Sequence, residues 1–211
     1  SSIMDTVHQY KIDNCAVVII AAGESKRLGS PKQLLLLDKD SMLNRLIKMV
    51  QKAVDFPIYL VLGANAEKIK AQLPNVSLNI VENTEWQEGM GSSIRLGVQA
   101  VASSANKHDG VLILVCDQPY LSESSIKDLI ALQAINNTAI AASFYANIAG
   151  TPALFHQSVF SDLLALKGDQ GAKRIIQERD QELAKLQFEK GVLDIDTPED
   201  YQQLLKEASK Q

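Results

Sequence analysis

The sequence predicts a three-layer α/β/α fold in which a mostly parallel, Rossmann-like β-sheet lies between two layers of helices. Two observations support this prediction. Short apolar runs rich in β-branched residues, such as 16–22 and 111–115, are typical of strands buried on both faces. These runs alternate along the chain with segments of helical periodicity, and this alternation favours right-handed crossovers between parallel strands.

The other elements follow from capping residues, apolar periodicity and chain breaks. Ser41 is a suitable N-cap for a helix whose apolar positions continue to Val50. The expected elements after it are a strand at 58–62, a helix at 66–73, a strand at 77–81, a helix capped by Ser92 or Ser93, a strand at 111–115, a helix at 122–136, a strand at 138–143, a turn at 145–152, a strand at 153–155, helices at 159–166 and 172–178, a strand at 192–195, and a helix capped by Thr197.

Length and composition are those of one well-packed domain. The chain has 211 residues, of which 46% are hydrophobic and 22% are charged, an ordinary composition for a soluble protein. Residues 1–14 show no periodicity, so we expect them to form a flexible extension. Residues 15–211 are then a single domain.

Charge and hydropathy argue against nucleic-acid and membrane partners. The balance of 21 basic and 25 acidic residues gives a formal net charge of −4, which has no general attraction for nucleic acid or an anionic membrane. No segment approaches the roughly 20 apolar residues of a membrane span, and the chain does not start with an export signal. Cys15 and Cys116 both adjoin apolar runs and suggest reduced, structural thiols. We therefore expect a cytoplasmic protein.

A polar loop after the first strand carries the charges of a polyphosphate site. The apolar run ends at Ala21 and Ala22, and the loop that begins at Gly23 holds three cations within seven residues, among them Arg27 and Lys32. Glycine lets the backbone turn tightly and approach a ligand, and the cations can balance phosphate charge. The spacing matches neither the G-x-x-x-x-G-K-[ST] loop of nucleotide hydrolases nor the dinucleotide fingerprint G-x-G-x-x-G.

Asp117 is a candidate metal ligand because it follows the predicted strand at 111–115. Ligands of open α/β sheets bind at the carboxyl ends of strands, so Asp117 should face the same cleft as the first loop. Carboxylates at such positions hold Mg²⁺ that bridges phosphate groups. The alternative is that Asp117 caps the helix at 122–136, although Pro119 lies between them. Asp196 precedes Thr197 and, by pattern alone, belongs to a capped helix start.

Two further segments combine glycine with a predicted helix start. Residues 83–91 lead into Ser92 and Ser93, whose hydroxyls can bind a nucleotide, although an ordinary loop and capped helix explain the pattern equally well. Residues 168–171 precede the helix at 172–178, whose free N–H groups can receive a phosphate. There the pattern itself favours a simpler arrangement, in which Gly168 ends one helix and Asp169 caps the next.

Residues 21–32 read A-A-G-x-S-x-R-x-G-x-P-K and resemble the signature of the nucleotidyltransferases. Those enzymes join a nucleoside triphosphate to a phosphorylated acceptor and release pyrophosphate. Three later stretches resemble the molybdenum cofactor cytidylyltransferases: C-D-Q-P at 116–119, G-T-P at 150–152 with G-D-Q-G-A at 168–172, and D-I-D-T-P-E-D at 194–200. The resemblance runs from about residue 15 to residue 205. One departure is that residues 38–41 read D-K-D-S, where relatives usually carry a glycine.

The resemblance implies a fold of the nucleotide-diphospho-sugar transferase type and a Mg²⁺-dependent transfer of CMP from CTP to molybdopterin. In this reading Arg27, Lys32 and Asp117 are catalytic, and Asp117 and Asp196 bind Mg²⁺. The implied nucleotide-binding residues are Ala21, Ala22, Gly23, Arg27, Lys32, Gly91, Ser92 and Ser93. The implied acceptor-binding residues are Gly150, Pro152, Gly168, Asp169 and Gly171. A molybdoenzyme that receives the product is a further implied, transient partner.

Three other functions stay open at this point. The nearest is guanylyl transfer from GTP to the same pterin, because loop geometry around residues 21–23 and 89–93 selects the base. A sugar-phosphate or polyol-phosphate nucleotidyltransferase is more distant, and the motif at 168–172 argues against it by resemblance. A carrier that binds the pterin cofactor without turnover would not need Arg27, Lys32, Asp117 and Asp196 together.

Overall fold

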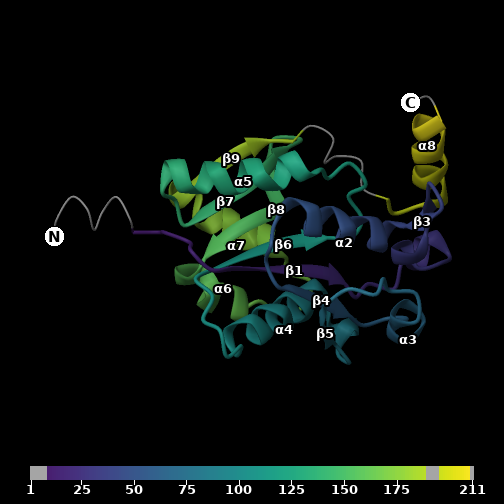
Figure 1. Ribbon diagram of the computed structural model, residues 1–211, viewed down its shortest axis with the longest axis horizontal. Helices are drawn as coiled ribbons and strands as arrows, with labels where there is room; N and C mark the ends of the chain where they lie inside the picture. Colours follow the sequence, from purple (N-terminus) through teal and green to yellow (C-terminus); the bar gives the residue numbers. More distant parts are fainter. Residues whose placement is uncertain (1–8, 189–194, 210–211) are drawn as a thin grey trace.

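Strand β1 (Cys15–Ala21) lies inside the sheet because all of its residues are apolar and buried. The computed structural model of the chain describes residues 9–188 and 195–209. It contains a seven-stranded sheet of order β5-β4-β1-β6-β8-β7-β9 and a separate two-stranded hairpin, β2-β3 (Figure 1). The remaining strands are β2 (Leu36–Leu37), β3 (Asp40–Ser41), β4 (Ile58–Leu62), β5 (Asn79–Glu82), β6 (Gly110–Val115), β7 (Ile140–Tyr145), β8 (Ile148–His156) and β9 (Leu183–Gln187).

Most neighbouring strands of the large sheet are parallel. β1 pairs in parallel with β4 and β6, β4 with β5, and β7 with β9. β8 runs antiparallel to both of its neighbours, β6 and β7. The predicted α/β fold with a mostly parallel sheet is confirmed.

Helices cover both faces of the sheet. The α-helices are α2 (Met42–Ala53), α3 (Ala66–Lys70), α4 (Met90–Ala102), α5 (Glu123–Asn136), α6 (Phe160–Leu164), α7 (Ala172–Glu178) and α8 (Pro198–Ser209), and short 3₁₀ turns include Lys26–Leu28, Lys32–Leu34, Trp86–Glu88, Gln157–Val159 and Asp180–Glu182. Helices α4, α6 and α7 pack on one face and α2 and α5 on the other (Figure 1).

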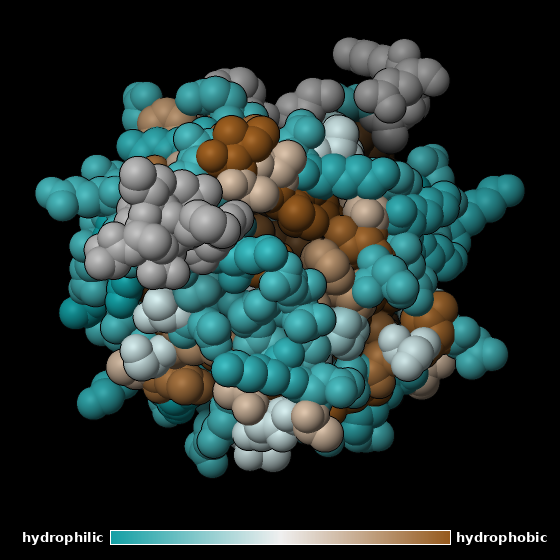
Figure 2. Space-filling view, turned by 60° about the vertical axis from the view of Figure 1, so that its left-hand side comes forward, coloured by the Kyte–Doolittle hydropathy of each residue, from teal (hydrophilic) through white to brown (hydrophobic). Residues whose placement is uncertain are grey.

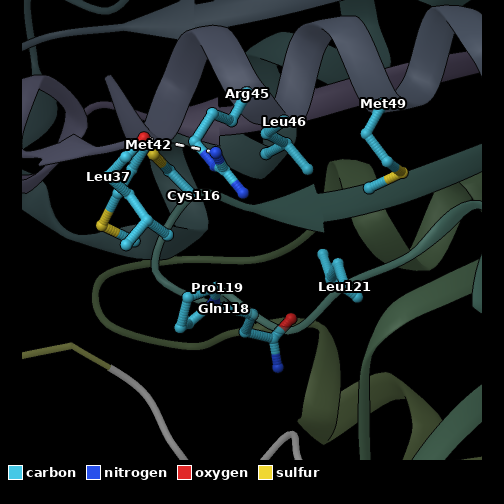
Figure 3. Close-up of a pocket in the computed structure, with 9 residues that line it drawn as sticks. All are labelled: Leu37, Met42, Arg45, Leu46, Met49, Cys116, Gln118, Pro119 and Leu121. Atoms are coloured by element: carbon cyan, nitrogen blue, oxygen red, sulfur yellow. Dashed lines mark hydrogen bonds between the residues drawn. The ribbon is translucent and has the colours of Figure 1, made fainter. Parts of the chain in front are cut away.

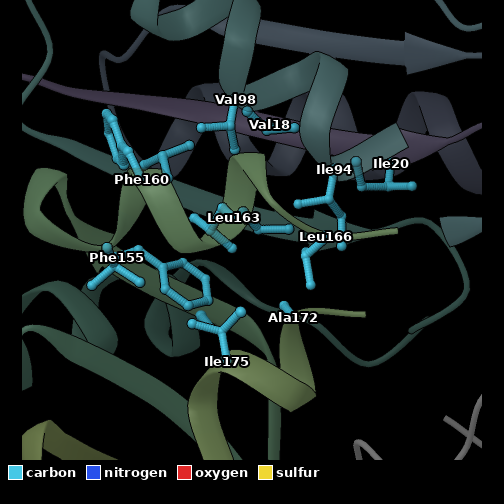
Figure 4. Packing of buried hydrophobic residues seen from close by; sticks show 14 of the residues in the cluster. Val18, Ile20, Ile94, Val98, Phe155, Phe160, Leu163, Leu166, Ala172 and Ile175 are labelled. Atoms are coloured by element: carbon cyan, nitrogen blue, oxygen red, sulfur yellow. The ribbon is translucent and has the colours of Figure 1, made fainter. Parts of the chain in front are cut away.

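Side-chain alternation along β1 divides the core into these two layers. Val18 and Ile20 point into the layer formed with α4, α6 and α7, and Figure 4 shows them beside Ile94 and Val98 of α4. Val17 and Ile19 belong to the cluster on the opposite face. All seven residues of β1 are at most 5% exposed. Because both faces are covered, this strand has no polar residue, as expected for a parallel sheet.

Several predicted element boundaries are confirmed. Ser41 caps α2 by accepting a hydrogen bond from the Asn44 N–H, and Ser122 caps α5. β4 and α7 have the predicted bounds, and Thr197 precedes α8. β9 is an edge strand with partly exposed residues that the sequence pattern does not predict.

Other predicted boundaries are wrong. Helix α4 begins at Met90 after Gly89, so neither Ser92 nor Ser93 is its N-cap. The N-cap of α7 is Gly171 rather than Asp169. Residues 145–152 do not form one turn, because β8 already begins at Ile148 and contains Gly150 and Pro152. Of the predicted strand at 192–195, residues 192–194 lie outside the described residues and Ile195 is not in a strand.

The last residues of the predicted N-terminal extension are bonded to the domain. The Tyr10 N–H donates to Asn137 Oδ1 at 3.0 Å, and Gln133 Nε2 donates to the Tyr10 carbonyl at 2.7 Å. The N–H groups of Asp13 and Asn14 donate to the Asp109 carboxylate. The boundary of the packed domain therefore lies before Tyr10.

The face of the molecule in Figure 2 is largely hydrophilic, with hydrophobic residues showing between polar ones. The large hydrophobic residues that are exposed are Leu36, Ile80, Met90, Ile135 and Ile148. Across residues 9–188 and 195–209, no helix has the length and apolar character needed to cross a membrane.

The β2–β3 turn places two non-glycine residues in the left-handed region, with φ 52° at Asp38 and 71° at Lys39. A two-residue hairpin turn with two positive φ angles favours glycine at its second position. We expect Lys39→Gly to raise the free energy of unfolding by about 1 kcal/mol, because glycine adopts this φ without strain. Urea denaturation measures the change. Lys52→Gly, in the last turn of α2, is the control and should destabilise the protein; an unchanged or less stable Lys39→Gly variant would contradict the prediction.

Candidate active site

The candidate site lies at the carboxyl ends of β1 and β6, where the order of the sheet reverses. From β1 the chain proceeds through β4 and β5 on one side, and β6 then pairs with β1 on the other side. Such a switch point is where open α/β sheets bind ligands. The first loop leaves β1 here, and Asp117 follows β6.

Lys32 joins three segments that are far apart in the sequence. Its Nζ lies 3.3 Å from Oδ2 of Asp117 and 3.0 Å from Oδ1 of Asp196. Nη2 of Arg27 lies 3.8 Å from the other carboxylate oxygen of Asp196. The structure therefore brings together the four charged residues that the sequence analysis singled out.

The four charged side chains differ in burial, and burial affects the pKa values of Lys32 and Asp117. The side chains of Lys32 and Asp117 are 17% and 23% exposed, whereas that of Arg27 is 73% exposed. Burial disfavours the charged form of Lys32, but the charges of Asp117 and Asp196 outweigh it and raise the pKa of Lys32. Burial raises the pKa of Asp117, and the Lys32 ammonium opposes that change. Lys32 is thus a fixed positive charge between Asp117 and Asp196.

Hydrogen bonds within the first loop hold Lys32 in position. The Lys32 N–H donates to Ser25 Oγ at 3.2 Å, and Ser25 itself has a left-handed backbone, φ 61°. The buried side chain of Gln33 donates from Nε2 to the carbonyls of Ala21 at 2.9 Å and Gly23 at 3.2 Å. Gln33 was not predicted, because a glutamine beside a polar loop gives no sign that it is buried.

The start of α8 positions Asp196. The N–H groups of Asp196 and Thr197 both donate to Oδ2 of Asp200 at 3.0 Å, and the Asp200 N–H donates to Thr197 Oγ1 at 3.2 Å. This is a reciprocal capping arrangement of a kind that T-P-E-D favours. In addition, the Ile195 N–H donates to the Asp117 carbonyl at 3.1 Å, which ties the two carboxylate segments together.

The cap at Asp200 predicts a stability change at acid pH. Hydrogen bonds from the Asp196 and Thr197 N–H groups lower the pKa of Asp200 below its ordinary value of 3.8. A lowered pKa gives stability that is fully present above pH 3.8 and is lost as the pH falls through the pKa of the folded protein. We expect Asp200→Asn to reduce this loss, measured as the free energy of unfolding between pH 5 and pH 2. The exposed Asp128, replaced by asparagine, is the control; identical pH profiles for wild type and Asp200→Asn would contradict the prediction.

The predicted nucleotide-binding serines face the interior. Asn83 Nδ2 donates to the hydroxyls of Ser92 at 2.8 Å and Ser93 at 2.9 Å, and Asn83 is fully buried. In this arrangement the two hydroxyls hold the loop before α4 against the helix. The Gly91 N–H donates to the Gly168 carbonyl at 2.9 Å, so the segments predicted to bind nucleotide and acceptor contact each other.

A cavity of about 230 Å³ adjoins Asp117 on the side of β7 and β8. Its lining residues are Met90, Ile94, Ile113, Val115, Asp117, Gln118, Tyr145, Gly150, Thr151, Gly171, Ala172 and Lys173. Of the predicted acceptor-binding residues, Gly150 and Gly171 line it, whereas Pro152, Gly168 and Asp169 are not among the lining residues. We call this space the acceptor-side cavity.

Gln118, Tyr145 and Lys173 line the acceptor-side cavity but were not predicted as site residues. Gln118 Nε2 donates to the Tyr145 hydroxyl at 3.2 Å and to the Thr151 carbonyl at 3.1 Å, which fixes the wall of the cavity. Lys173 supplies a cation. Gln118 could have been predicted as a site residue, since it directly follows Asp117 in the sequence. Tyr145 and Lys173 could not, because only tertiary contacts bring them to the cavity.

A second, smaller cavity of about 130 Å³ lies between α2 and residues 116–121. Figure 3 shows Leu46 and Met49 of α2 facing Pro119 and Leu121 across it. Its single cation, Arg45, already donates to the Leu37 carbonyl at 3.2 Å and lies 3.5 Å from Asp38. This space, whose lining residues are mostly apolar, therefore has no unpaired cation for a phosphate.

Comparison with known proteins identifies the family. A model described as the MobA-like NTP transferase domain matches residues 17–183. The chain belongs to this family. It is thus a nucleotidyltransferase that acts on nucleotide substrates.

Individual relatives of this MobA-like NTP transferase cover most of the chain. The purine catabolism protein PucB of Bacillus subtilis is 29% identical over 87% of this chain and 92% of its own length. The solved structure of a homologue of Mycobacterium tuberculosis rv0371c from Mycobacterium sp. strain JC1 is 31% identical, covers 93% of this chain and 97% of its own, and has a TM-score of 0.78. Rv0371c of Mycobacterium tuberculosis, solved in complex with manganese, is 26% identical. It covers 92% of this chain and 98% of its own, and has a TM-score of 0.76.

Proposed function

We propose that this MobA-like enzyme transfers CMP from CTP to molybdopterin and releases pyrophosphate. The observation that carries the proposal is the contact of Lys32 with both Asp117 and Asp196 at the switch point of the sheet. A fixed cation between two carboxylates suits a site that must hold a triphosphate together with a divalent ion. The choice of CTP and of molybdopterin rests on the resemblance of residues 116–119, 150–152 and 168–172.

The reaction needs positioning and charge neutralisation rather than a general base. An oxygen of the acceptor phosphate attacks the α-phosphorus, and the bond from that phosphorus to the bridging oxygen of the β-phosphate breaks as pyrophosphate leaves. A phosphate monoester is ionised at neutral pH, with a second pKa of about 6, so no proton must be removed. Lys32 and Arg27 bind the triphosphate and stabilise the charge that develops on the leaving pyrophosphate.

Asp117 and Asp196 are the residues that would hold Mg²⁺. Their carboxylates share the Lys32 ammonium as a common cationic partner, which shows that a positive charge is accommodated between them. Two protein carboxylates would leave the remaining positions around the ion to water and phosphate oxygens, as Mg²⁺ prefers. When bound, Mg²⁺ supplies charge neutralisation on the phosphate oxygens. The manganese complex of Rv0371c supports a divalent cation.

The acceptor-side cavity favours an acceptor with a flat, partly apolar body. Met90, Ile94 and Val115 are among its lining residues, and Tyr145 supplies an aromatic ring. A sugar or polyol would lose water from those hydroxyls that face these apolar side chains. A pterin presents ring faces that apolar and aromatic side chains can cover.

Pyrophosphate release with each of the four nucleoside triphosphates, with and without molybdopterin and Mg²⁺, tests the proposal. We expect release that requires all of CTP, molybdopterin and Mg²⁺. Faster release with GTP would assign the chain to guanylyl transfer on the same pterin. If the protein binds molybdopterin but releases pyrophosphate from none of the nucleotides, it is a carrier. Pyrophosphate release only with sugar phosphates as acceptors would overturn the acceptor assignment.

A further inference from the structure

We propose that Lys173 binds the phosphate of the acceptor in the acceptor-side cavity, so that this cavity selects phosphate monoesters. The inference rests on the proposed function, and it adds a residue that no motif assigned. Lys173 lies in the first turn of α7 (Ala172–Glu178) and lines the same cavity as Asp117.

The position of Lys173 suits the attacking group rather than the leaving group. Asp117 marks the place where the α-phosphate must lie, and the attacking phosphate must reach that place from a neighbouring space. The acceptor-side cavity is such a space, since Asp117 forms part of its wall. A phosphate that enters it meets Lys173, while the triphosphate lies toward Lys32 and Arg27 on the first loop.

The charges of the site leave Lys173 as the available counter-charge. Lys32 is shared between Asp117 and Asp196, and Arg27 also pairs with Asp196. Lys173 is exposed and forms no ion pair with any part of the chain that the structure describes, whereas the adjacent Arg174 pairs with Glu178 at 3.0 Å. An acceptor phosphate carries close to two negative charges at pH 7, and it must approach a triphosphate of like charge. An unpaired ammonium in the cavity wall reduces that repulsion.

The lining next to Lys173 leaves space for a phosphate. Gly171 has no side chain, and a Cβ added there would meet only Met90 Cγ, at 3.9 Å. The smaller cavity on the other side of residues 116–121 has Arg45 as its cation, and that group is already bonded to Leu37 and paired with Asp38. Of these two spaces, the acceptor-side cavity, which has Asp117 in its lining, is therefore the one suited to an anion.

Steady-state kinetics of Lys173→Ala test the inference. We expect the KM for molybdopterin to rise about 10- to 100-fold, as for the loss of one charge-assisted hydrogen bond, while the KM for CTP changes less than about twofold. Lys173→Arg should restore most of the affinity for the acceptor. Lys127→Ala, an exposed lysine of α5 outside the cavity lining, is the matched control and should behave as wild type. A rise in the KM for CTP instead would place Lys173 on the triphosphate and overturn the inference.

The two proposals fail in different ways. If wild type turns over molybdopterin and Lys173→Ala has an unchanged acceptor KM, the inference falls and the proposed function stands. If wild type has no activity with molybdopterin, the proposed function falls, and calorimetry with inorganic phosphate at saturating magnesium pyrophosphate tests Lys173 directly. Weaker phosphate binding by Lys173→Ala than by Lys127→Ala supports a phosphate-selecting cavity, and equal binding overturns it.

Discussion

Replacing Lys32 with alanine is expected to lower kcat for pyrophosphate release by about 10²- to 10³-fold, the loss typical of removing one preorganised group that stabilises developing negative charge. Lys32 is the residue that contacts both carboxylates, at 3.3 Å from Asp117 and 3.0 Å from Asp196. Alanine leaves those two carboxylates without their shared cation and removes a fixed positive charge from the triphosphate. The measurement is steady-state pyrophosphate release at saturating CTP, acceptor and Mg²⁺.

The neighbouring Lys26 provides a matched control for this variant. It belongs to the same loop, but its side chain is 80% exposed and pairs with the exposed Glu24 at 3.7 Å. Exposed ion pairs of this kind contribute little, so Lys26→Ala should retain near wild-type turnover. Near-normal turnover of Lys32→Ala would remove the main support for the proposed function. Equal losses in both variants would indicate a general effect on the loop instead.

The elements most accurately predicted from the sequence are those whose ends are fixed by local signals. Ser41 caps α2 as predicted, α5 begins at Glu123, one residue after its predicted start, and β4 ends at Leu62, directly before Gly63. In each case the deciding group lies within three residues of the boundary. The alternation of strands and helices could also be predicted from the local sequence, because strands buried on both faces appear as continuous apolar runs.

Boundaries that depend on distant partners could not be predicted. Ser92 and Ser93 have the composition of N-cap residues, but Asn83 holds both hydroxyls in the interior and the helix begins earlier, at Met90. Gly150 is typical of a turn, yet it lies in β8 because that strand pairs with β7. In both regions a tertiary contact overrides the local preference of the residue.

The charged centre of the site was predictable, whereas the walls around it were not. Asp117 follows a clear buried strand, and a loop with three cations must find counter-charges, so a common site is the simplest arrangement. Asp196 was assigned as a metal ligand by resemblance, since its own pattern indicates only a capped helix start. Gln33 and Lys173 carry no local signal, because their roles come from burial and from a cavity that the fold creates.

Asp117→Asn is expected to abolish the response to Mg²⁺ and to reduce turnover by about 10²-fold or more. The amide keeps the shape of the side chain, so Lys32 keeps an oxygen acceptor, but a neutral oxygen is a poor ligand for a hard divalent cation. The measurement is pyrophosphate release as a function of Mg²⁺ concentration, combined with calorimetric binding of Mn²⁺. Asp128→Asn, an exposed aspartate of α5, is the control and should retain the wild-type response.

Loss of activity in Asp117→Asn should occur without loss of stability. Burial raises the pKa of Asp117 above its ordinary value of 3.8. A carboxyl group with a raised pKa in the folded protein lowers the free energy of unfolding at any pH where it is ionised. Removing the charge at neutral pH is therefore expected to leave the thermal midpoint unchanged or higher, a common relation between catalytic groups and stability. If the variant unfolds at a lower temperature than wild type, misfolding would explain its inactivity. A folded variant that still responds to Mg²⁺ would show that Asp117 is not the metal ligand.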